Sequence, residues 1–310
     1  MKILGIGNAI VDVICKVEDS FLQENSLTKS TMKLVDGNEL NRLLSNLKIE
    51  ETVSGGSVAN SIVGLSQLGN KVGFIGKVSD DDFGRKYEEG LEKENIQYFY
   101  KKKKESLPTG TCLILVTPDS ERTMITFLGT AGKIHGDDID LNAVKKSEIL
   151  FLEGYLWDEG APKEAFDKAI NNANKVAMSL SDLFCVERHK NSFLNLVKNK
   201  LDITFANQQE IMSLLGTNRF EEVIEFAKKT GKLILITRGE NGSLAIKGDE
   251  VIECYAEKNL KIIDLTGAGD LFAGGFLHGY INGKSIKESL KKGTEMSSKV
   301  IQIIGARLNR

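Results

Sequence analysis

The sequence has little of the residue types that mark several large classes of protein. Its 310 residues include only three prolines, three histidines and four cysteines. The cysteines form no C-x-x-C pair and the histidines show no zinc-ligand spacing, so a structural zinc site and a disulfide framework are not indicated. The scarcity of proline and the lack of low-complexity segments argue against a long linker between independent domains.

An excess of charge of either sign is also missing. The 41 Lys and Arg nearly balance the 43 Asp and Glu, giving a formal net charge of -2. A nucleic-acid-binding protein usually carries a basic excess, so no nucleic-acid partner is expected. No apolar run approaches the roughly 20 residues of a membrane span, and the apolar start is interrupted by Asn8 and Asp12. We therefore expect no membrane association and a cytoplasmic, reducing location.

Short apolar runs bounded by turn residues alternate with helix-like stretches along most of the chain. This alternation predicts an α/β fold with a doubly wound, mainly parallel sheet covered by helices on both faces. The expected strands are 2–7, 71–76, 148–154, 175–180, 202–207 and 232–239, and the expected helices are 57–69, 83–95, 161–174, 190–200 and 219–230.

Two regions, 12–54 and 97–131, break this alternation. The second predicts a hairpin with a turn at Pro118-Asp119-Ser120. Strand-rich insertions of this kind often form a small second layer over a site. We therefore expect a discontinuous core of 1–11, 55–96 and 132–310, with the two inserted regions forming a small β-sheet above it.

The most informative motif is Asp264-Leu265-Thr266-Gly267-Ala268-Gly269-Asp270, followed by a stretch rich in small residues. A glycine-rich turn that opens a helix directs free N–H groups and the positive end of the helix dipole at one point, which suits a phosphate. Asp270 would then lie in the first helical turn, placed to accept a proton from an attacking hydroxyl. A carboxylate that merely interacts with the helix dipole is the alternative interpretation.

Other glycine patterns compete for the same phosphate-binding interpretation. Gly5-Ile6-Gly7 follows a predicted strand, but Ile10 stands where a dinucleotide fingerprint requires its third glycine. The Gly-Lys pairs at 76–77 and 283–284 each lack another required residue of a P-loop. The sequence therefore supports neither a nicotinamide dehydrogenase nor a P-loop NTPase.

Three further segments place polar side chains where a polyol substrate could bind. Asn8 and Asp12 flank the end of the first strand, the edge at which open α/β sheets bind ligands. Gly55 and Gly56 introduce a helix whose first turn carries Asn60, an amide that can both donate and accept hydrogen bonds. An ordinary turn cap and an ordinary helix start remain alternatives for these segments.

Two strand ends further along the chain suggest a nucleotide site. Asn207 and Glu210 follow one apolar strand, and Thr237 and Gly239 end the next. Mg²⁺ prefers oxygen ligands and retains several waters, so Glu210 acting through water would suffice together with nucleotide phosphates. A helix cap and a plain turn are the alternatives.

Taken together and in this order, these segments resemble the ribokinase-like (PfkB) family of sugar and nucleoside kinases over essentially the whole chain. The resemblance implies that 267–269 form an anion hole and that Asp270 is the catalytic base. It implies that ATP lies along the loops 207–210, 237–239 and 264–270, with Thr266 among its contacts, and that the inserted regions close over the substrate as a β-lid.

Within that family the nearest likeness is to adenosine kinases. It rests on Gly7–Asp12, on Gly55–Ser57 with Asn60-Ser61, and on Pro108–Cys112. The same likeness places Cys112, Tyr155 and Phe184 at the substrate, with the two aromatic residues lining a purine pocket.

Other features are shared with sugar kinases. The segment 120–124 is as close to that branch, and Leu265 and Thr266 differ from the usual adenosine-kinase residues. From the hairpin, Arg122 is expected to reach the transferred phosphate or else to be a solvent-exposed tip. The family's cation site implies K⁺ held by Asp264 and by carbonyl groups near 266 and 300–305.

The sequence thus predicts an ATP- and Mg²⁺-dependent kinase that phosphorylates a primary hydroxyl, most readily converting adenosine to AMP in purine salvage. The alternative is a fructokinase- or ribokinase-like enzyme acting on a free sugar. A non-catalytic ligand sensor is a further alternative, which the complete Gly267–Asp270 motif argues against. The expected partner is a small-molecule nucleoside or sugar, in a monomer or a homodimer.

Overall fold

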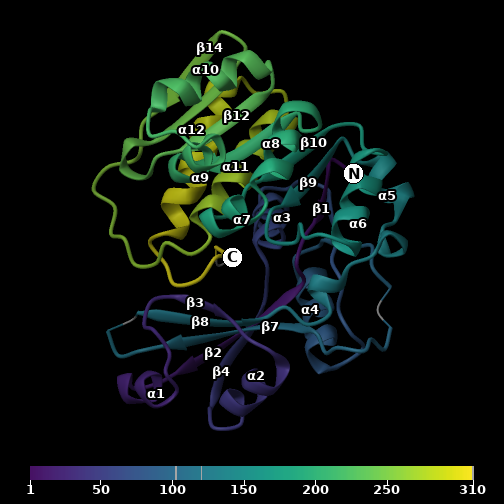
Figure 1. Ribbon diagram of the computed structural model, residues 1–310, viewed down its shortest axis with the longest axis vertical. Coiled ribbons are helices and arrows are strands. Elements are labelled where there is room, and N and C mark those ends of the chain that lie inside the picture. The colour runs from purple at the N-terminus through teal and green to yellow at the C-terminus, as the bar shows by residue number, and fades with distance from the viewer. Residues whose placement is uncertain (102, 120, 309–310) are drawn as a thin grey trace.

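A computed structural model describes residues 1–101, 103–119 and 121–308, whose strands form two separate sheets (Figure 1). The large sheet has the strand order β14-β13-β12-β11-β10-β9-β1-β5-β6. Its strands are β1 (Ile3–Ile6), β5 (Val72–Ile75), β6 (Gln97–Tyr98), β9 (Ile149–Glu153), β10 (Val176–Ser179), β11 (Ile203–Asn207), β12 (Leu233–Thr237), β13 (Ser243–Lys247) and β14 (Glu250–Cys254).

Helices cover both faces of this sheet, as the alternating pattern predicted. One face is packed by α3 (Ser57–Gln67), α4 (Asp82–Lys93), α11 (Ala268–Ile281) and α12 (Ile286–Val300). The other face is packed by α5 (Leu141–Lys146), α6 (Ala161–Ile170), α7 (Leu183–Arg188), α8 (Lys190–Asn199), α9 (Gln208–Leu215) and α10 (Phe220–Thr230). Single 3₁₀ turns lie at η1 (Ala131–Lys133), η2 (Gly136–Asp138) and η3 (Gly239–Asn241).

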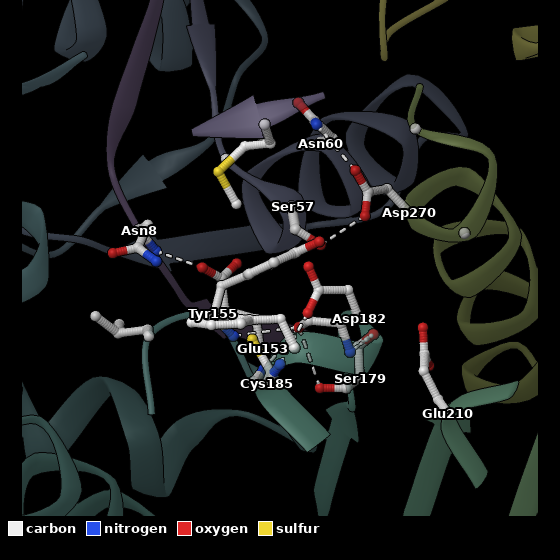
Figure 2. Close-up of a pocket in the computed structure, with 18 of the residues that line it drawn as sticks. Asn8, Ser57, Asn60, Glu153, Tyr155, Ser179, Asp182, Cys185, Glu210 and Asp270 are labelled. Carbon is white, nitrogen blue, oxygen red and sulfur yellow. Dashed lines mark hydrogen bonds between the residues drawn. The ribbon is translucent and has the colours of Figure 1, made fainter. Parts of the chain in front are cut away.

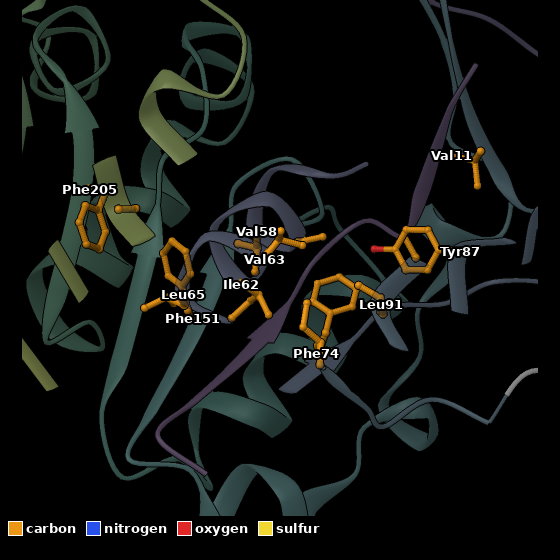
Figure 3. Packing of buried hydrophobic residues seen from close by; sticks show 14 of the residues in the cluster. Val11, Val58, Ile62, Val63, Leu65, Phe74, Tyr87, Leu91, Phe151 and Phe205 are labelled. Atoms are coloured by element: carbon orange, nitrogen blue, oxygen red, sulfur yellow. The ribbon is translucent and has the colours of Figure 1, made fainter. Parts of the chain in front are cut away.

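The central strands are buried on both faces, which explains why they are apolar throughout rather than alternating. On the face covered by α3, the side chains of Phe74, Ile62 and Leu65 are fully buried (Figure 3). Burying each such side chain contributes about 1.5–3 kcal/mol. All six predicted strands of this sheet are present, and the doubly wound fold is confirmed.

The strand order reverses beside β1, which pairs in parallel with β5 on one side and with β9 on the other. From β1 the chain continues outward through β5 and β6, then returns to build β9 to β12 on the opposite side. Such a switch point opens a crevice at the carboxyl ends of the strands. The segments after β1 and β9 are therefore held at the edge where ligands bind.

The small sheet has the order β3-β8-β7-β2-β4 and lies across this edge. Its strands are β2 (Ile10–Lys16), β3 (Met32–Leu34), β4 (Ile49–Gly55), β7 (Gly110–Val116) and β8 (Arg122–Phe127). Helices α1 (Asp19–Glu24) and α2 (Gly37–Leu44) pack against its outer face, which leaves the inner face turned toward the large sheet (Figure 1).

The structure places the boundaries of this second layer differently from the expected 12–54 and 97–131. Strand β2 begins at Ile10, because only residues 7–9 separate it from β1. Residues 97–98 form β6 and pair with β5, so they belong to the large sheet. The predicted hairpin is present as antiparallel β7 and β8; Ser120 of its turn is outside the described residues.

Candidate active site

A pocket of about 800 Å³ lies between the carboxyl edge of the large sheet and the inner face of the small sheet. Segments far apart in sequence meet in its wall. Of the predicted residues, the structure places the following in that wall: Asn8, Asp12, Gly56, Asn60, Cys112, Tyr155, Phe184, Asn207, Glu210, Thr237, Gly239 and Thr266 through Asp270.

The loop before α11 forms one side of the pocket. Gly267 is the N-cap of this helix, and its φ of 78° lies in the left-handed region that favours glycine. A Cβ at Gly267 would also lie 2.6 Å from Cα of Ala306, so the C-terminal segment packs directly on the loop. The helix therefore begins in the pocket wall. Its Ala268 N–H donates to the Leu265 carbonyl at 3.2 Å, and the free N–H groups of a helix's first turn are the arrangement that binds anions.

Asp270, in the first turn of α11, is held by two donors from α3. Ser57 Oγ donates to Oδ1 at 2.6 Å and Asn60 Nδ2 donates to Oδ2 at 2.9 Å (Figure 2). Burial raises the pKa of the Asp270 carboxyl to about 6, and these hydrogen bonds with the positive charge of Arg307 oppose the rise. A base whose pKa lies close to neutrality can both accept and return a proton.

The Gly55-Gly56 loop is fitted closely to the segment after β1. Gly56 has a φ of 102°, and a Cβ there would lie 2.2 Å from the carbonyl oxygen of Asn8. A Cβ on Gly55 would lie 2.5 Å from the Asp12 carboxylate. The two glycines thus allow α3 to start next to Asn8 and Asp12. Burial raises the pKa of Asp12 to about 7, opposed by Arg307 and Arg122.

Glu153, at the end of β9, joins both segments and was not among the predicted residues. Its side chain is fully buried and accepts the backbone N–H of Asn8 on Oε1 and of Val58 on Oε2, both at 2.8 Å. Burial raises its pKa to about 7, although the two N–H donors favour the charged form. A buried carboxylate therefore holds the start of α3 beside the end of β1.

Asn207 and Glu210 form a capping box at the start of α9. The Asn207 side chain accepts the N–H of Glu210 at 2.8 Å, and Glu210 accepts the N–H and Nδ2 of Asn207 at 2.9 and 2.6 Å. The same two residues therefore cap α9 and line the pocket. Burial raises the pKa of Glu210 to about 7. Among the described residues no group of three or more His, Cys, Asp or Glu side chains is arranged to hold a metal.

The aromatic residues expected near a substrate line the same pocket. Tyr155 and Phe184 are 40% and 53% exposed, consistent with an open wall. Cys112 faces them from β7 and is buried, which raises the pKa of its thiol to about 12, so it is a neutral wall group.

Arg122 and Asp264 do not line the pocket but pair with each other. Arg122 Nη1 lies 2.9 Å from Asp264 Oδ2, which also accepts the N–H of Gly305 at 2.8 Å. Asp264 Oδ1 accepts the N–H and Oγ1 of Thr266 at 2.9 and 2.6 Å. All four acceptor positions of this carboxylate are used by these donors, so the carboxylate itself leaves no free position for K⁺. Arg122 is neither an exposed hairpin tip nor a pocket residue: it ties β8 to the loop before α11.

Three residues of this region, Ser57, Glu153 and Arg307, were not among the predicted site residues, although Ser57 belongs to the Gly55–Ser57 motif. Ser57 directly follows the Gly55-Gly56 pair, and Glu153 ends an apolar strand as Asn207 does, so both could have been found by the same strand-end argument. Arg307, whose Nε donates to Asn60 Oδ1 at 2.9 Å, lies in no motif. Only the tertiary structure brings it to the site.

Comparison with known proteins places this geometry in a family. The model of the pfkB family carbohydrate kinases matches residues 2–310. The chain belongs to the PfkB family. It is accordingly an ATP-dependent kinase. None of the described helices is long and apolar enough to cross a membrane.

Relatives with different names resemble the chain to a similar degree. The structure of adenosine kinase from Sinorhizobium meliloti is 36% identical with a TM-score of 0.90, covering 100% of this chain and 96% of that one. A probable sugar kinase from Rhizobium etli is 37% identical with a TM-score of 0.90, covering 100% and 95%. A 5-dehydro-2-deoxygluconokinase from Halalkalibacterium halodurans is 30% identical, covering 85% of each chain. Likeness alone therefore does not select the acceptor.

Proposed function

We propose that this kinase transfers the γ-phosphoryl group of ATP to the primary hydroxyl of a nucleoside, converting adenosine to AMP in purine salvage. The observation that carries this proposal is the division of the pocket into two chemically different parts. Polar groups gather around Asp270, whereas the inner face of the small sheet contributes mainly apolar side chains: Ile10, Met32, Leu34, Cys112, Met124 and Leu128.

This division suits a ligand with hydroxyls at one end and a flat, weakly polar ring at the other. Asn8 is 3% exposed and its Oδ1 has no hydrogen-bond partner within the described part of the chain. A buried acceptor of this kind gains from a donor supplied by a ligand, such as a ribosyl hydroxyl. A free sugar carries hydroxyls on every side and would leave some of them against apolar carbon.

The nucleotide side of the pocket offers the groups that phosphates require. The start of α11 supplies N–H donors, and Glu210, which lines the same pocket, offers carboxylate oxygens with unused lone pairs. These oxygens fit Mg²⁺ held through water. When bound, Mg²⁺ neutralises charge on the phosphate oxygens, and it would also favour the ionised form of Glu210.

The proposed chemistry is an in-line displacement. The acceptor oxygen forms a bond to the γ-phosphorus, the bond to the β-phosphate oxygen breaks, and ADP leaves. Asp270 takes the hydroxyl proton, while the α11 N–H groups stabilise charge on the transferred group. Because such transition states are loose, most of the rate enhancement comes from positioning, to which Ser57 and Asn60 contribute by fixing Asp270.

The test is ADP formation with Mg-ATP and a panel of acceptors: adenosine, other ribonucleosides, ribose, fructose and 5-dehydro-2-deoxygluconate. Turnover concentrated on adenosine is expected. Turnover on a free sugar, with no turnover on adenosine, would contradict the proposal that adenosine is the acceptor. It would favour the sugar-kinase alternative, which the similarity to a 5-dehydro-2-deoxygluconokinase supports.

Asp270→Asn is expected to lower kcat by about 10²–10⁴-fold with smaller changes in KM, because the lost group acts on the proton in the transition state. Asp249→Asn, on the exposed turn between β13 and β14, is the matched control. An unchanged kcat in Asp270→Asn would show that Asp270 is not the group that accepts the hydroxyl proton.

A further inference from the structure

The segment that follows α12 runs back to the loop before α11 and to α3, and four consecutive residues of it contact these two elements. Gly305 N–H donates to Asp264, Ala306 packs on Gly267, Arg307 Nε donates to Asn60, and the Leu308 carbonyl accepts Gln67 Nε2 at 3.1 Å. In Figure 1 this C-terminal segment ends between the large sheet's layers and the small sheet. These contacts hold the segment against the loop before α11 and along α3, and one of the partners, Asn60, donates to Asp270.

The contact between Arg307 and Asn60 determines which way the Asn60 amide faces. With Oδ1 accepting from Arg307 at 2.9 Å, the amide must present Nδ2 to Asp270 Oδ2, also at 2.9 Å. The reversed amide would set Nδ2 against the guanidinium and Oδ1 against the carboxylate, so both contacts would become repulsive. Arg307 therefore selects the orientation in which Asn60 donates to Asp270.

The guanidinium also places a positive charge among buried acids. Asp12, Asp270 and Glu94 favour the charged form of Arg307, as does Tyr87, while burial lowers its pKa. In return, Arg307 opposes the rise in pKa that burial imposes on Asp12 and Asp270. Arg307 itself does not line the pocket, so any influence on the reaction passes through the residues it contacts.

We propose that Arg307 is a positioning residue for Asp270: it fixes the Asn60 amide so that Asn60 donates to the Asp270 carboxylate, and its buried positive charge favours the ionised form of this carboxylate. The role in orienting a catalytic base rests on the proposed function. The contacts and the effect on ionisation of Asp270 do not, and they can be tested without turnover.

The first test measures the ionisation of Asp270 through protein stability in the absence of ligands. The free energy of unfolding is measured from pH 4 to 9 for the wild type and for Arg307→Met, each with and without the additional substitution Asp270→Asn. In each background, the difference that Asp270→Asn makes is plotted against pH. Because the pKa of Asp270 is raised from 3.8 to about 6, stability attributable to this group is present at low pH, is lost as pH rises, and stops changing above the folded-state pKa.

Removing the charge should move this levelling-off to higher pH. In an Arg307→Met background we expect an upward shift of about one pH unit, the size of effect that a nearby opposite charge produces. The other ionisable groups that face Asp270, namely Asp12, Glu153 and Tyr155, are unchanged in every protein compared. Arg307→Lys keeps the charge and should restore the wild-type value, and it serves as the second variant if Arg307→Met does not fold.

The second test is kinetic and uses whichever acceptor the wild-type enzyme phosphorylates. Arg307→Met should lower kcat by about 10-fold or more with KM values changed less than threefold, because positioning of the base is lost while the pocket wall is kept. In an Asn60→Ala background the same substitution should lower kcat by less than about threefold, because the two residues act together. Arg219→Met, at an exposed position before α10, is the matched control.

The outcomes are separable. The stability attributable to Asp270 stops changing above a certain pH. If that pH is the same in the Arg307→Met and wild-type backgrounds, the proposal is overturned, whatever the kinetic result. A kcat loss that is equally large with and without Asn60 overturns positioning through that amide. If the wild-type enzyme phosphorylates no acceptor in the panel, the proposed function fails, and the stability measurement still decides the role of Arg307 in the ionisation of Asp270.

Discussion

Glu153→Gln tests how the buried acids of the pocket respond to pH. Burial raises the pKa of Glu153 from 4.5 to about 7 even though its oxygens accept two backbone N–H groups. Between these values the folded protein retains the Glu153 proton and the unfolded chain has lost it. The free energy of unfolding therefore falls as pH rises, with the full contribution present below pH 4.5 and gone above pH 7.

The size of the effect follows from the shift. One pKa unit corresponds to about 1.4 kcal/mol, so a shift of 2.5 units gives roughly 3 kcal/mol. Glutamine cannot titrate, and its amide nitrogen cannot accept the N–H that one carboxylate oxygen accepts. That second effect is a cost of about 1–3 kcal/mol at every pH, so it displaces the curve without changing its slope.

The assay is urea denaturation of the ligand-free wild type and Glu153→Gln at intervals from pH 4.5 to 8. The stability advantage of the wild type should shrink by roughly 3 kcal/mol across this range. Glu148→Gln, an exposed partner of Lys2 beside the same strand, is the control, and its difference should stay within about 1 kcal/mol. A pH-independent difference for Glu153→Gln would show that the two N–H donors outweigh burial, refuting the reasoning.

Two further substitutions test how the pocket is built. Gly56→Ala adds a methyl group 2.2 Å from the Asn8 carbonyl oxygen at a φ of 102°, and it should lower the free energy of unfolding by about 3 kcal/mol or more. Gly69 also has a positive φ but has open space where a Cβ would lie. Gly69→Ala should therefore lower the free energy of unfolding by only about 1 kcal/mol. Equal losses of unfolding free energy in the two variants would show that the positive φ, and not the contact with the Asn8 carbonyl oxygen, causes the loss in Gly56→Ala. Arg122→Met removes the partner of Asp264 and should cost about 1–3 kcal/mol in urea denaturation, whereas an unchanged value would show that this ion pair does not stabilise the contact between the sheets.

The large sheet and much of the pocket were predictable because they follow from local signals. Apolar runs separated by helical stretches predict a doubly wound sheet, and the carboxyl ends of parallel strands converge at one edge. Asn8, Asn60 and Asp270 each follow a strand end or open a helix after glycine, and the structure places all three in the wall of one pocket.

What could not be predicted depends on contacts between distant segments. Nothing near Asp264 in sequence indicates that Arg122, from the other sheet, occupies its carboxylate. Arg307 lies 247 residues from Asn60, in a segment without a motif. The first boundary of the small sheet was misplaced for a related reason: β1 and β2 are separated by three residues, and hydropathy cannot show that they join different sheets.

The pocket brings together Asp12, Glu153, Glu210 and Asp270, and burial raises the pKa of each to between about 6 and 7. At neutral pH the ligand-free protein thus holds carboxylates whose ionisation opposes folding, and it retains them although apolar residues would pack there at lower cost. Hydrogen bonds limit this cost for three of the acids: backbone N–H groups for Glu153, the Asn207 amide and N–H for Glu210, and side chains of α3 for Asp270. The charge of Arg307 limits it for Asp12 and Asp270. A ligand that donates hydroxyl hydrogen bonds to these acids would relieve the remaining cost, so binding and stability should rise together, most strongly where the acids are ionised. The burial that raises the pKa of Asp270 also opposes folding of the ligand-free protein, so the role proposed for Arg307, acting through Asn60, would affect stability and the basicity of Asp270 together.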